Sequence, residues 1–422
     1  NQNRLYLYRY VAREHSSQKK EKLQKMGYHS IIYIFLFLPV CLFVYQLAPE
    51  KWRGRVLLGF SWIFFYLLSG KLLVYLLGTT LLTHCIGIWL TVIRMQEAKA
   101  VEGLERKQKK AVKMEYQKKG RRVLALGIFI LLGILGYLKY FDFFTVNLSH
   151  LFGHPVLEGW RPENLLMPIG ISFYTLQAIG YMTDVYWGTI QAETEIWRTA
   201  LFLGFFPQIM EGPIARYSDV ADTLYTGKSL EYRNVVDGYV RIFWGLFKKM
   251  VIADRMALMV NQVFDHYADY HGAVILAAAI GYVIQLYMEF SGCMDIIIGS
   301  GKLFGICLPE NFRQPFCAKN PSEFWRRWHI TLGAWFKAYI FYPVSVSGLV
   351  KKWNQYGRKH CGKHITRLVT SAIALFPVWV ANGVWHGAQW NYSFLWNVLL
   401  CSDHAWDCCR TGSRPYFRSV SY

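Results

Sequence analysis

Long runs without a charged side chain are the feature of this sequence that most restricts its fold. Residues 30–48 contain no Asp, Glu, Lys or Arg, and residues 368–400 contain none over 33 positions. Residues 56–92 contain a single such side chain, that of Lys71. A helix rises about 1.5 Å per residue, so about 20 apolar residues cross a hydrocarbon core roughly 30 Å thick. The sequence therefore predicts an all-α, polytopic integral membrane protein.

The apolar runs predict eight to ten helices that cross or re-enter the membrane, within one integral membrane domain over residues 26–400. The segment 323–344 is predicted to lie at the membrane interface, because its charges and three tryptophans disfavour a full crossing. The helical ranges expected from the pattern are 30–48, 56–69, 71–93, 122–140, 165–184, 199–211, 237–260, 272–300, 368–386 and 388–400.

The basic residues lie in the polar segments between these runs. The net charge is +20, which in a soluble protein would suggest a nucleic-acid partner. Here residues 94–122 contain eleven Lys or Arg and four Glu, while residues 351–367 contain six Lys or Arg and no acid. The positive-inside rule predicts that both segments are cytoplasmic, and the more acidic segment 141–163 is predicted to be external. Attraction to anionic membrane lipid accounts for these charges, and no nucleic-acid partner is expected.

The two ends of the chain differ from its middle. Residues 1–25 form a polar extension that begins with Asn, and Met26 stands just before the first apolar run, so we expect the extension not to be native. Residues 401–422 form an atypical tail that loses the apolar pattern; a native cytoplasmic tail and a frameshift or truncation both remain open. The nine cysteines are scattered without zinc-type spacing, which predicts neither a metal site nor a disulfide framework.

One histidine stands alone in the last apolar run. His386 is the only His, Asp, Glu, Lys or Arg between residues 368 and 400. Ionisable groups at such positions are costly and tend to face a cavity or a partner, and desolvation is expected to keep this imidazole neutral. A neutral imidazole can accept a proton as a general base. Gly383 and Gly387 permit close approach of a ligand, and Asn382, one turn earlier, could orient the ring. The alternative is a histidine that serves packing alone.

The stretch EFWRRWHITLGAWF, residues 323–336, combines aromatic and basic side chains. Its aromatic and apolar residues recur every three or four positions and predict one face of a continuous amphipathic helix. Arg326 and His329 are expected beside that face, with Glu323 within reach of Arg326 or Arg327. The residues of the aromatic face are Trp325, Trp328, Leu332, Trp335 and Tyr339.

Four basic residues around this stretch form a predicted rim on the cytoplasmic side. Arg313 precedes it in the segment PENFRQPF, and the other three are Arg326, Arg327 and Lys337. Arginine offers paired donors that suit phosphate, so the rim fits a phosphate-bearing ligand. Anionic lipid headgroups would satisfy it equally well.

Other polar groups within apolar runs are interpreted as packing or ion-pairing groups. Residues 205–219 contain Pro207, Gly212 and Pro213, which predict a broken helix around Glu211. The remaining groups are Ser172, Thr175, Gln177, Asp184, Glu289 and Asp295.

Five blocks of this sequence carry a family resemblance: LMPIGISFYTLQAIGYMTDVYWG, FFPQIMEGPIARYSD, EFSGCMDIIIGSGKLFGICLPENFRQPF, SEFWRRWHITLGAWFKAYIFYPV and VWHGAQWNYSFLW. Together they resemble the bacterial membrane-bound O-acyltransferases, most closely the alginate O-acetylation branch. The resemblance runs from about residue 26 to 400 and implies a ring of transmembrane helices with a funnel from each side. It implies that His386 is the catalytic histidine and His329 the second conserved one. It also implies further helices beyond residue 400, so that the chain is expected to be incomplete at its C-terminal end.

The predicted function is O-acyl transfer, most simply of acetyl groups, from a cytoplasmic thioester donor such as acetyl-CoA across or at the membrane, for O-acetylation of a cell-envelope or exported polysaccharide. The resemblance implies a multi-pass protein of the bacterial plasma membrane, no bound cofactor, and an extracytoplasmic acetyltransferase as partner. D-Alanyl transfer to teichoic acid and a non-catalytic transporter are the alternatives. Predicted catalytic residues are His386 and His329; predicted substrate-binding residues are Arg313, Arg326, Arg327, Asn382 and Trp325.

Overall fold

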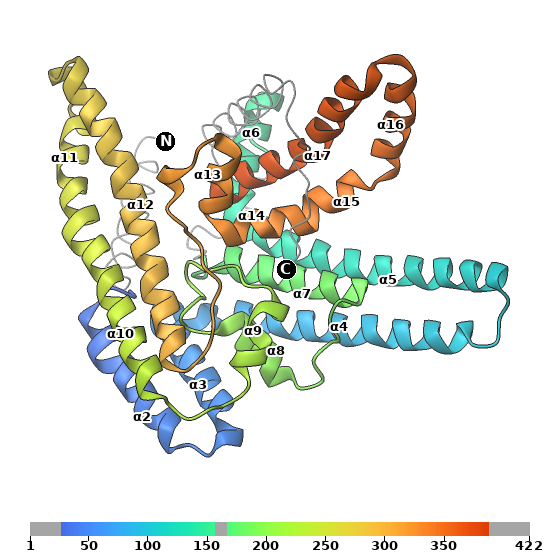
Figure 1. Ribbon diagram of the computed structural model, residues 1–422, viewed down its shortest axis with the longest axis horizontal. Helices are drawn as coiled ribbons and strands as arrows, with labels where there is room; N and C mark the ends of the chain where they lie inside the picture. Colours follow the sequence, from blue (N-terminus) through green and yellow to red (C-terminus); the bar gives the residue numbers. More distant parts are fainter. Residues whose placement is uncertain (1–26, 157–166, 388–422) are drawn as a thin grey trace. The chain divides into compact units, whose positions relative to one another are not determined.

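The computed structural model describes residues 27–156 and 167–387, which form helices joined by turns, without a strand (Figure 1). Within this part of the chain, four stretches are helical, long and apolar enough to cross a membrane: Glu50–Val101, Arg106–Phe152, Gly272–Leu303 and Gly362–His386. The predicted all-α, polytopic membrane protein is confirmed. The expectations for residues 1–25, 388–400 and 401–422 lie outside the described residues.

The chain divides into two compact units, and each is described by itself. The first unit comprises residues 1–138 and 164–311. Its helices are η1 (Tyr33–Phe37), α2 (Leu38–Leu47), α3 (Glu50–Ser69), η2 (Gly70–Leu72), α4 (Leu73–Val101), α5 (Arg106–Leu135), α7 (Ile171–Trp187), α8 (Ile196–Gly204), α9 (Tyr217–Leu224), α10 (Tyr232–Leu246), η4 (Phe247–Ala253), α11 (Asp254–Asp265), η5 (Tyr267–Asp269) and α12 (Gly272–Leu303).

An aromatic cluster forms the centre of the first unit. Tyr33, Phe37, Phe64 and Phe206 pack with ring centroids 5.2–6.3 Å apart. The hydroxyl of Tyr28 joins this cluster to the turn after α8, since it donates to the carbonyl of Phe206 at 2.8 Å and accepts from the amide of Met210 at 3.2 Å. The cluster thus joins the first helices to residues about 170 positions later in the sequence.

The predicted helix at 199–211 is only partly correct. Helix α8 ends at Gly204, and residues 205–215 continue as buried turns. The amide of Phe206 donates to Ser61 Oγ at 3.1 Å, and Gln208 Nε2 donates to the carbonyl of Phe202 at 2.9 Å. Protein contacts therefore satisfy this irregular backbone, which is the condition for such backbone at membrane depth. The break that the prolines predicted is present, and it begins a few residues earlier than expected.

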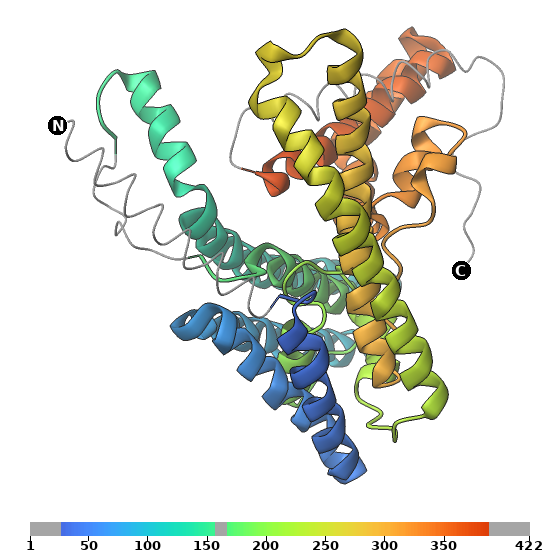
Figure 2. The same ribbon diagram turned by 90° about the vertical axis from the view of Figure 1, so that its left-hand side faces the viewer.

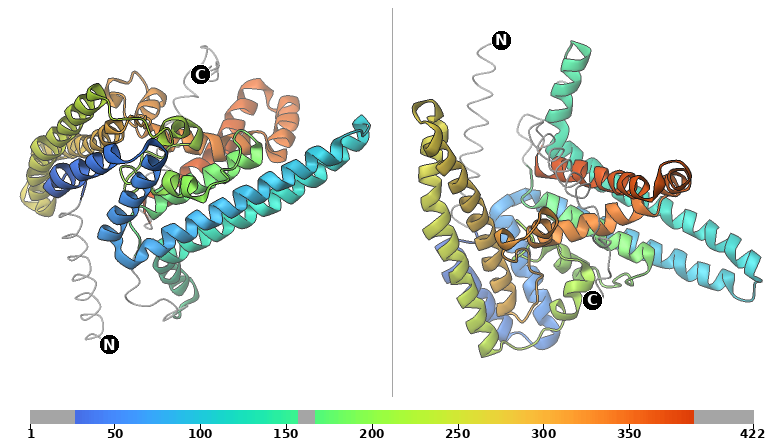
Figure 3. Two further views of the ribbon diagram at one scale, coloured as in Figure 1. Left: turned by 90° about the horizontal axis from the view of Figure 1, so that it is seen from below. Right: turned by 45° about the horizontal axis from the view of Figure 1, so that its top comes forward.

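Helices α4 and α5 form a hairpin that carries the first basic segment. They run side by side, with α7 packed against both (Figure 3). Gly127 and Gly120 of α5 lie at the contacts, where an added Cβ would meet Ile86 at 3.2 Å and Tyr186 at 3.2 Å. The end of the hairpin is formed by residues 102–105, and most side chains of residues 105–119 are exposed.

Helices α10 and α12 lie lengthwise against each other, as Figure 2 shows. Glycines allow the close approach: a Cβ on Gly245 would lie 2.4 Å from the carbonyl oxygen of Gly292, and one on Gly299 would lie 2.7 Å from that of Gly238. Small residues at helix contacts in membranes have this effect, because they let the backbones approach.

Ion pairs follow the same helix contact. Asp295 accepts from Arg241 Nε at 3.1 Å and from Lys248 Nζ at 2.6 Å, and Arg241 also forms a bidentate pair with Glu310 at 2.6 Å. Lys249 pairs with Glu289 at 2.7 Å. The carboxylates of Asp295 and Glu289, which interrupt an apolar run, therefore serve ion pairing. A carboxylate among apolar surroundings is tolerable only when it is paired in this way.

The second unit comprises residues 139–163 and 312–422. The helix that begins as α5 continues through η3 (Gly136–Tyr140) into α6 (Phe141–Phe152). Helix α16 (Gly348–His360) packs along α17 (Gly362–His386), where Trp353 Nε1 donates to the carbonyl of Thr366 at 3.2 Å. The other helices are η6 (Pro315–Cys317), α13 (Pro321–Arg327), α14 (Ile330–Phe336), η7 (Lys337–Phe341) and α15 (Tyr342–Ser345).

Candidate active site

The stretch predicted as one amphipathic helix is broken at its histidine. Helix α13 ends at Arg327, Trp328 is extended, and His329 adopts the left-handed conformation with φ 46° and ψ 52° before α14 begins at Ile330. The continuous helix over this stretch is therefore wrong. The aromatic residues keep their three- and four-residue spacing on both sides of the break. Trp328 and His329 do not lie on a helical face, however, because neither residue has a helical backbone.

Capping groups fix helix α13 on either side of its arginines. Asn320 accepts the amide of Glu323 at 2.9 Å, and Pro321 occupies the first turn, where a missing amide hydrogen has little cost. Beyond the other end, the amide of Arg313 donates to the carbonyl of Arg327 at 3.0 Å. This bond satisfies one of the carbonyls that a helix end leaves without an intrahelical partner.

Arg327 is a structural clamp as well as part of the basic rim. Its Nη2 donates to Glu323 at 2.6 Å, as the spacing predicted, and its Nη1 lies 3.4 Å from the carbonyl of Gln314. The amide of Lys319 and the guanidinium of Arg327 lower the pKa of Glu323, so its carboxylate stays charged at neutral pH. The clamp therefore persists above the lowered pKa and is lost as the pH falls through it.

Three of the four predicted rim residues line one hollow of about 550 Å³. Its lining residues are Arg313, Gln314, Arg326 and Arg327, all within the second unit, and Lys337 is not one of them. The side chains of Arg313 and Arg326 are exposed, while Arg327 is half-buried. A volume of this size is within the range of small-molecule sites, and three guanidinium groups around it favour an anion.

The structure brings the two predicted catalytic histidines together through a tryptophan. The ring of Trp385 lies edge-to-face with that of His329, 5.7 Å between centroids, and with that of His386, 4.9 Å between centroids. His329 is buried, with 5% of its surface exposed, whereas His386 is exposed. Burial lowers the pKa of His329, and the nearby His386 lowers it further, so the His329 imidazole is neutral at physiological pH.

His386 occupies the last position of helix α17, because its neighbour Gly387 leaves the helical conformation. The predicted helix 368–386 therefore ends at the expected residue. The end of α17 is held by two side chains that the sequence reasoning missed. Lys139 Nζ donates to the carbonyl of Trp385 at 2.7 Å, and the hydroxyl of Tyr140 donates to that of Val384 at 2.7 Å. Lys139 is the only Lys, Arg, Asp or Glu between residues 122 and 142, a signal that could have identified it.

Trp325 and Asn382 do not line the arginine-lined hollow. The ring of Trp325 packs edge-to-face on that of Trp379 in α17, with centroids 5.4 Å apart, so it joins α13 to the helix of His386. Asn382 Oδ1 is buried and has no hydrogen-bond partner among residues 27–156 and 167–387. The oxygen of Asn382 therefore does not orient the His386 ring within the described structure, and the substrate-binding role of both residues stays a prediction.

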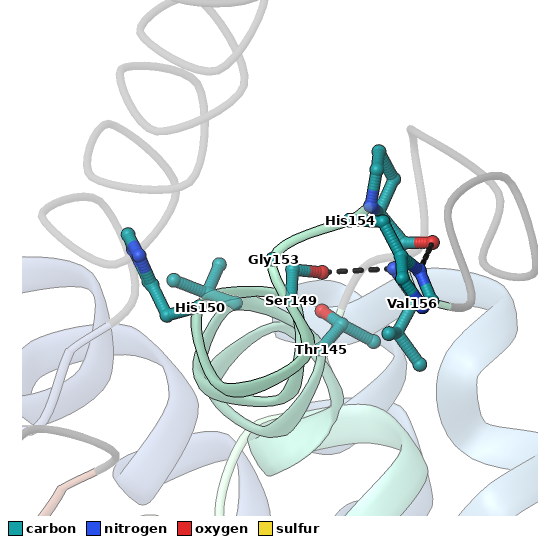
Figure 4. Close-up of a pocket in the computed structure, with 8 residues that line it drawn as sticks. Thr145, Ser149, His150, Gly153, His154 and Val156 are labelled. Carbon is teal, nitrogen blue, oxygen red and sulfur yellow. Dashed lines mark hydrogen bonds between the residues drawn. The ribbon is translucent and has the colours of Figure 1, made fainter.

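A second hollow of about 410 Å³ lies at the C-terminal end of α6 (Figure 4). Its hydroxyls already hold the helix end and the following turn: Ser149 Oγ accepts from the amide of Val156 at 2.9 Å, and Thr145 Oγ1 donates to the carbonyl of Asp142 at 3.0 Å. His150 points away from His154, whose Nδ1 lies 3.3 Å from the neighbouring carbonyl of Pro155. These polar groups stabilise a loop, and they converge on no common point.

The sequence profile of the membrane-bound O-acyltransferase family, MBOAT, matches residues 72–358. This match covers more than half of the chain and runs through both units. The chain belongs to the membrane-bound O-acyltransferase family. The matched range includes His329 and the arginine-lined hollow. Trp385 and His386 lie after the end of this range.

Individual relatives of this MBOAT chain agree with the family match. It is 31% identical over 373 residues to the probable alginate O-acetylase AlgI of Pseudomonas putida. This match covers 88% of this chain and 69% of the relative. It is 29% identical over 408 residues to the peptidoglycan O-acetyltransferase of Helicobacter pylori, covering 88% and 68%. A teichoic acid D-alanyltransferase of Bacillus subtilis is 31% identical over 235 residues, covering 55% of this chain and 56% of the relative.

These findings confirm the predicted class, a multi-pass bacterial membrane protein of the O-acyltransferase family. The chain spans 69% of the length of the Pseudomonas putida protein and 64% of that of the Pseudomonas aeruginosa AlgI, to which it is also 31% identical.

Proposed function

We propose that the chain moves an acetyl group from a thioester donor in the cytoplasm to an acceptor hydroxyl at or across the membrane, for O-acetylation of a cell-envelope or exported polysaccharide. Two of the relatives are named O-acetylases, one of alginate and one of peptidoglycan, and both matches cover 88% of this chain. The acyl donor is acetyl-CoA or another acyl thioester, and an extracytoplasmic acetyltransferase takes the acetyl group onward to the polymer.

The observation that carries this proposal is the cluster of His329, Trp385 and His386 in the same unit as the arginine-lined hollow. His329 follows Arg327 by two positions, so the chain itself keeps the hollow within a few residues of the imidazoles. Neutral imidazole beside an anion-binding hollow is the combination that hydroxyl acylation by a phosphate-bearing thioester requires.

The proposed reaction assigns one role to each group. Arg313 and Arg326 bind phosphate of the donor, while Arg327 holds the hollow together. The exposed imidazole of His386 takes the proton of the acceptor hydroxyl, whose oxygen attacks the thioester carbonyl. The carbon–sulfur bond breaks, and the thiolate leaves with the proton that the imidazole accepted. One general base contributes about 10²–10⁴-fold, so positioning of the two substrates supplies the rest.

D-Alanyl transfer to teichoic acid is the second candidate, favoured by the match to the Bacillus subtilis enzyme. That match covers 55% of this chain, compared with 88% for the two O-acetylases. The same histidine and arginine roles would serve it, since a D-alanyl thioester and an acetyl thioester have the same reacting carbonyl. The two functions are distinguished by the acyl group found on the product.

The test is the ester content of envelope polysaccharide in cells that express wild type, His386→Ala or His364→Ala at equal membrane levels. His364 is an exposed histidine in the first turn of the same helix, about 33 Å from His386 along the axis, and is the matched control. We expect acetyl ester to disappear with His386→Ala and to persist with His364→Ala. Unchanged acetylation in His386→Ala would overturn the catalytic assignment, and D-alanyl ester in place of acetyl ester would favour the second candidate.

A further inference from the structure

Lys139 is placed against the end of the helix that carries the proposed base. It belongs to η3, a π-helical turn between α5 and α6, in which one extra residue is accommodated in a helix. Such turns alter the direction of the side chains that follow, and they are frequent at functional sites. The side chain of Lys139 is half-buried, and its ammonium lies 5.2 Å from the ring centroid of Tyr140 and 5.9 Å from that of Trp385.

Lys139 and its neighbour Tyr140 satisfy two of the carbonyls at the end of α17. The last four carbonyls of a helix have no intrahelical partner. In α17 the carbonyl of Gly383 accepts from the amide of Gly387 at 3.4 Å, that of Val384 from the hydroxyl of Tyr140, and that of Trp385 from Lys139. The ammonium also provides a positive charge at a helix C-terminus, where the helix dipole favours one.

The carbonyl that Lys139 holds belongs to the residue on which both imidazoles pack. The ring of Trp385 packs edge-to-face with the rings of both His329 and His386. Its peptide bond leads directly into His386. A shift of the Trp385 carbonyl would therefore move the indole and the catalytic imidazole together.

We propose that Lys139 is a positioning residue, which fixes the Trp385 carbonyl and thereby the orientation of His386 toward the acceptor hydroxyl. This inference rests on the proposed function. Lys139 does not take or give the transferred proton, and it does not contact the donor phosphate. Its contribution is to the geometry of the base, and misplacement of a catalytic group by about 1 Å can cost on the order of 10²-fold in rate.

The experiment compares Lys139→Met, Lys139→Arg and Tyr140→Phe with wild type in membranes containing equal amounts of protein. Methionine retains length but removes the donor and the charge, arginine restores both, and phenylalanine removes a helix-end hydrogen bond that does not touch Trp385. Lys139→Met should lower kcat about tenfold or more with the donor KM unchanged within twofold, and Lys139→Arg should recover most of the loss. Tyr140→Phe should keep kcat within about threefold, since its bond ends one residue earlier.

His386→Ala in the same assay separates this inference from the proposed function. If His386→Ala abolishes transfer and Lys139→Met keeps the wild-type kcat, the role of Lys139 is overturned while the base assignment stands. Equal losses in Lys139→Met and Tyr140→Phe, with no recovery in Lys139→Arg, would also overturn it, because this result means that only helix-end stability matters. If His386→Ala keeps the wild-type rate, both proposals fail.

Discussion

The backbone of His329 is held in a conformation that most residues avoid. Its φ of 46° and ψ of 52° lie in the left-handed region, which costs a residue with a Cβ about 1–3 kcal/mol and persists only where surrounding contacts offset that cost. Two contacts hold His329 in place. Its carbonyl accepts from the amide of Gly333 at 3.1 Å, which starts α14, and its ring packs against the indole of Trp385. Strain of this kind is typical of functional positions, where side-chain placement matters more than local stability.

Substitution of His329 can separate its backbone role from its imidazole. Asparagine tolerates the left-handed conformation better than alanine, so His329→Asn should retain most of the thermal stability, whereas His329→Ala should be less stable by about 1–2 kcal/mol. Both variants should lose most acyl transfer if the imidazole supports the site. The measurement is the melting temperature in detergent together with transfer rate, and an active His329→Asn would show that the ring is dispensable.

The three arginines of the hollow are expected to differ in what they contribute. Arg313→Ala should raise the donor KM about tenfold or more, which is the effect of one charge-assisted hydrogen bond worth about 1.5–3 kcal/mol, and should leave the melting temperature unchanged. Arg327→Ala should affect both quantities, because this side chain also holds Glu323 and the carbonyl of Gln314.

The control for the arginine variants is Lys351→Ala, which removes an exposed positive charge from α16 of the same unit. It should leave the donor KM unchanged. If Lys351→Ala raises KM as much as Arg313→Ala does, the effect comes from general charge, and the assignment of the hollow as the donor site is contradicted.

At the scale of helices, the contact between α10 and α12 depends on backbone approach. Gly238 and Gly245 on one side face Gly299 and Gly292 on the other, two turns apart in each helix. Without a hydrophobic driving force between helices in lipid, such close packing and the ion pairs along it hold the two together. The four glycines therefore act as one feature of the helix pair.

Enlarging one of these glycines should separate the helices. Gly245→Leu places side-chain atoms where the Gly292 carbonyl oxygen and Ile296 now lie, and overpacking of this kind costs about 1–3 kcal/mol or more. The matched control is Gly133→Ala in α5, whose added Cβ would meet nothing within 4 Å and which should gain helix propensity. Melting temperatures in the same detergent provide the comparison. A stable Gly245→Leu would mean that the helix pair tolerates separation.

Length and hydropathy were sufficient to predict the long apolar helices from the sequence. The predicted range 272–300 corresponds to α12, Gly272–Leu303, and 368–386 to most of α17, Gly362–His386, because length and hydropathy alone determine such helices. The break at His329 could not be predicted, since the aromatic spacing continues across it and the packing on Trp385 lies 56 positions later. The contact of Lys139 with Trp385 joins residues 246 positions apart, which no local pattern encodes.

At the scale of the whole chain, acidic residues pair with basic ones between helices, whereas the surplus of basic residues is concentrated in two polar segments. Within the described residues, the acids of the α10–α12 contact are matched by bases, as in the pairs of Asp295 with Lys248 and of Glu289 with Lys249. The surplus that produces the net charge of +20 collects instead at helix ends, above all in residues 94–122 and 351–367. Paired charges stabilise the helix contact, whereas the surplus of bases in these two segments predicts the orientation in the membrane.

The orientation follows as a prediction for two basic segments in different units. The end of the α4–α5 hairpin exposes Arg106, Lys107 and Lys110, and α16 exposes Lys351 and Lys352. Both should face the cytoplasm, so trypsin should cut both in inverted vesicles and neither in intact spheroplasts. Mass spectrometry of the fragments identifies the cut sites.

Spheroplasts permeabilised with detergent are the control, because they show whether these helical segments are cleavable at all. Cleavage at Lys107 or Lys110 in intact spheroplasts would place the hairpin outside and contradict the orientation for the first unit; cleavage at Lys351 or Lys352 would do so for the second. The result also bears on the proposed chemistry, since Arg313 and Arg326 can bind a cytoplasmic donor only if their unit opens toward that side. Cleavage in α16 therefore tests the predicted side of one segment of the unit that contains these arginines.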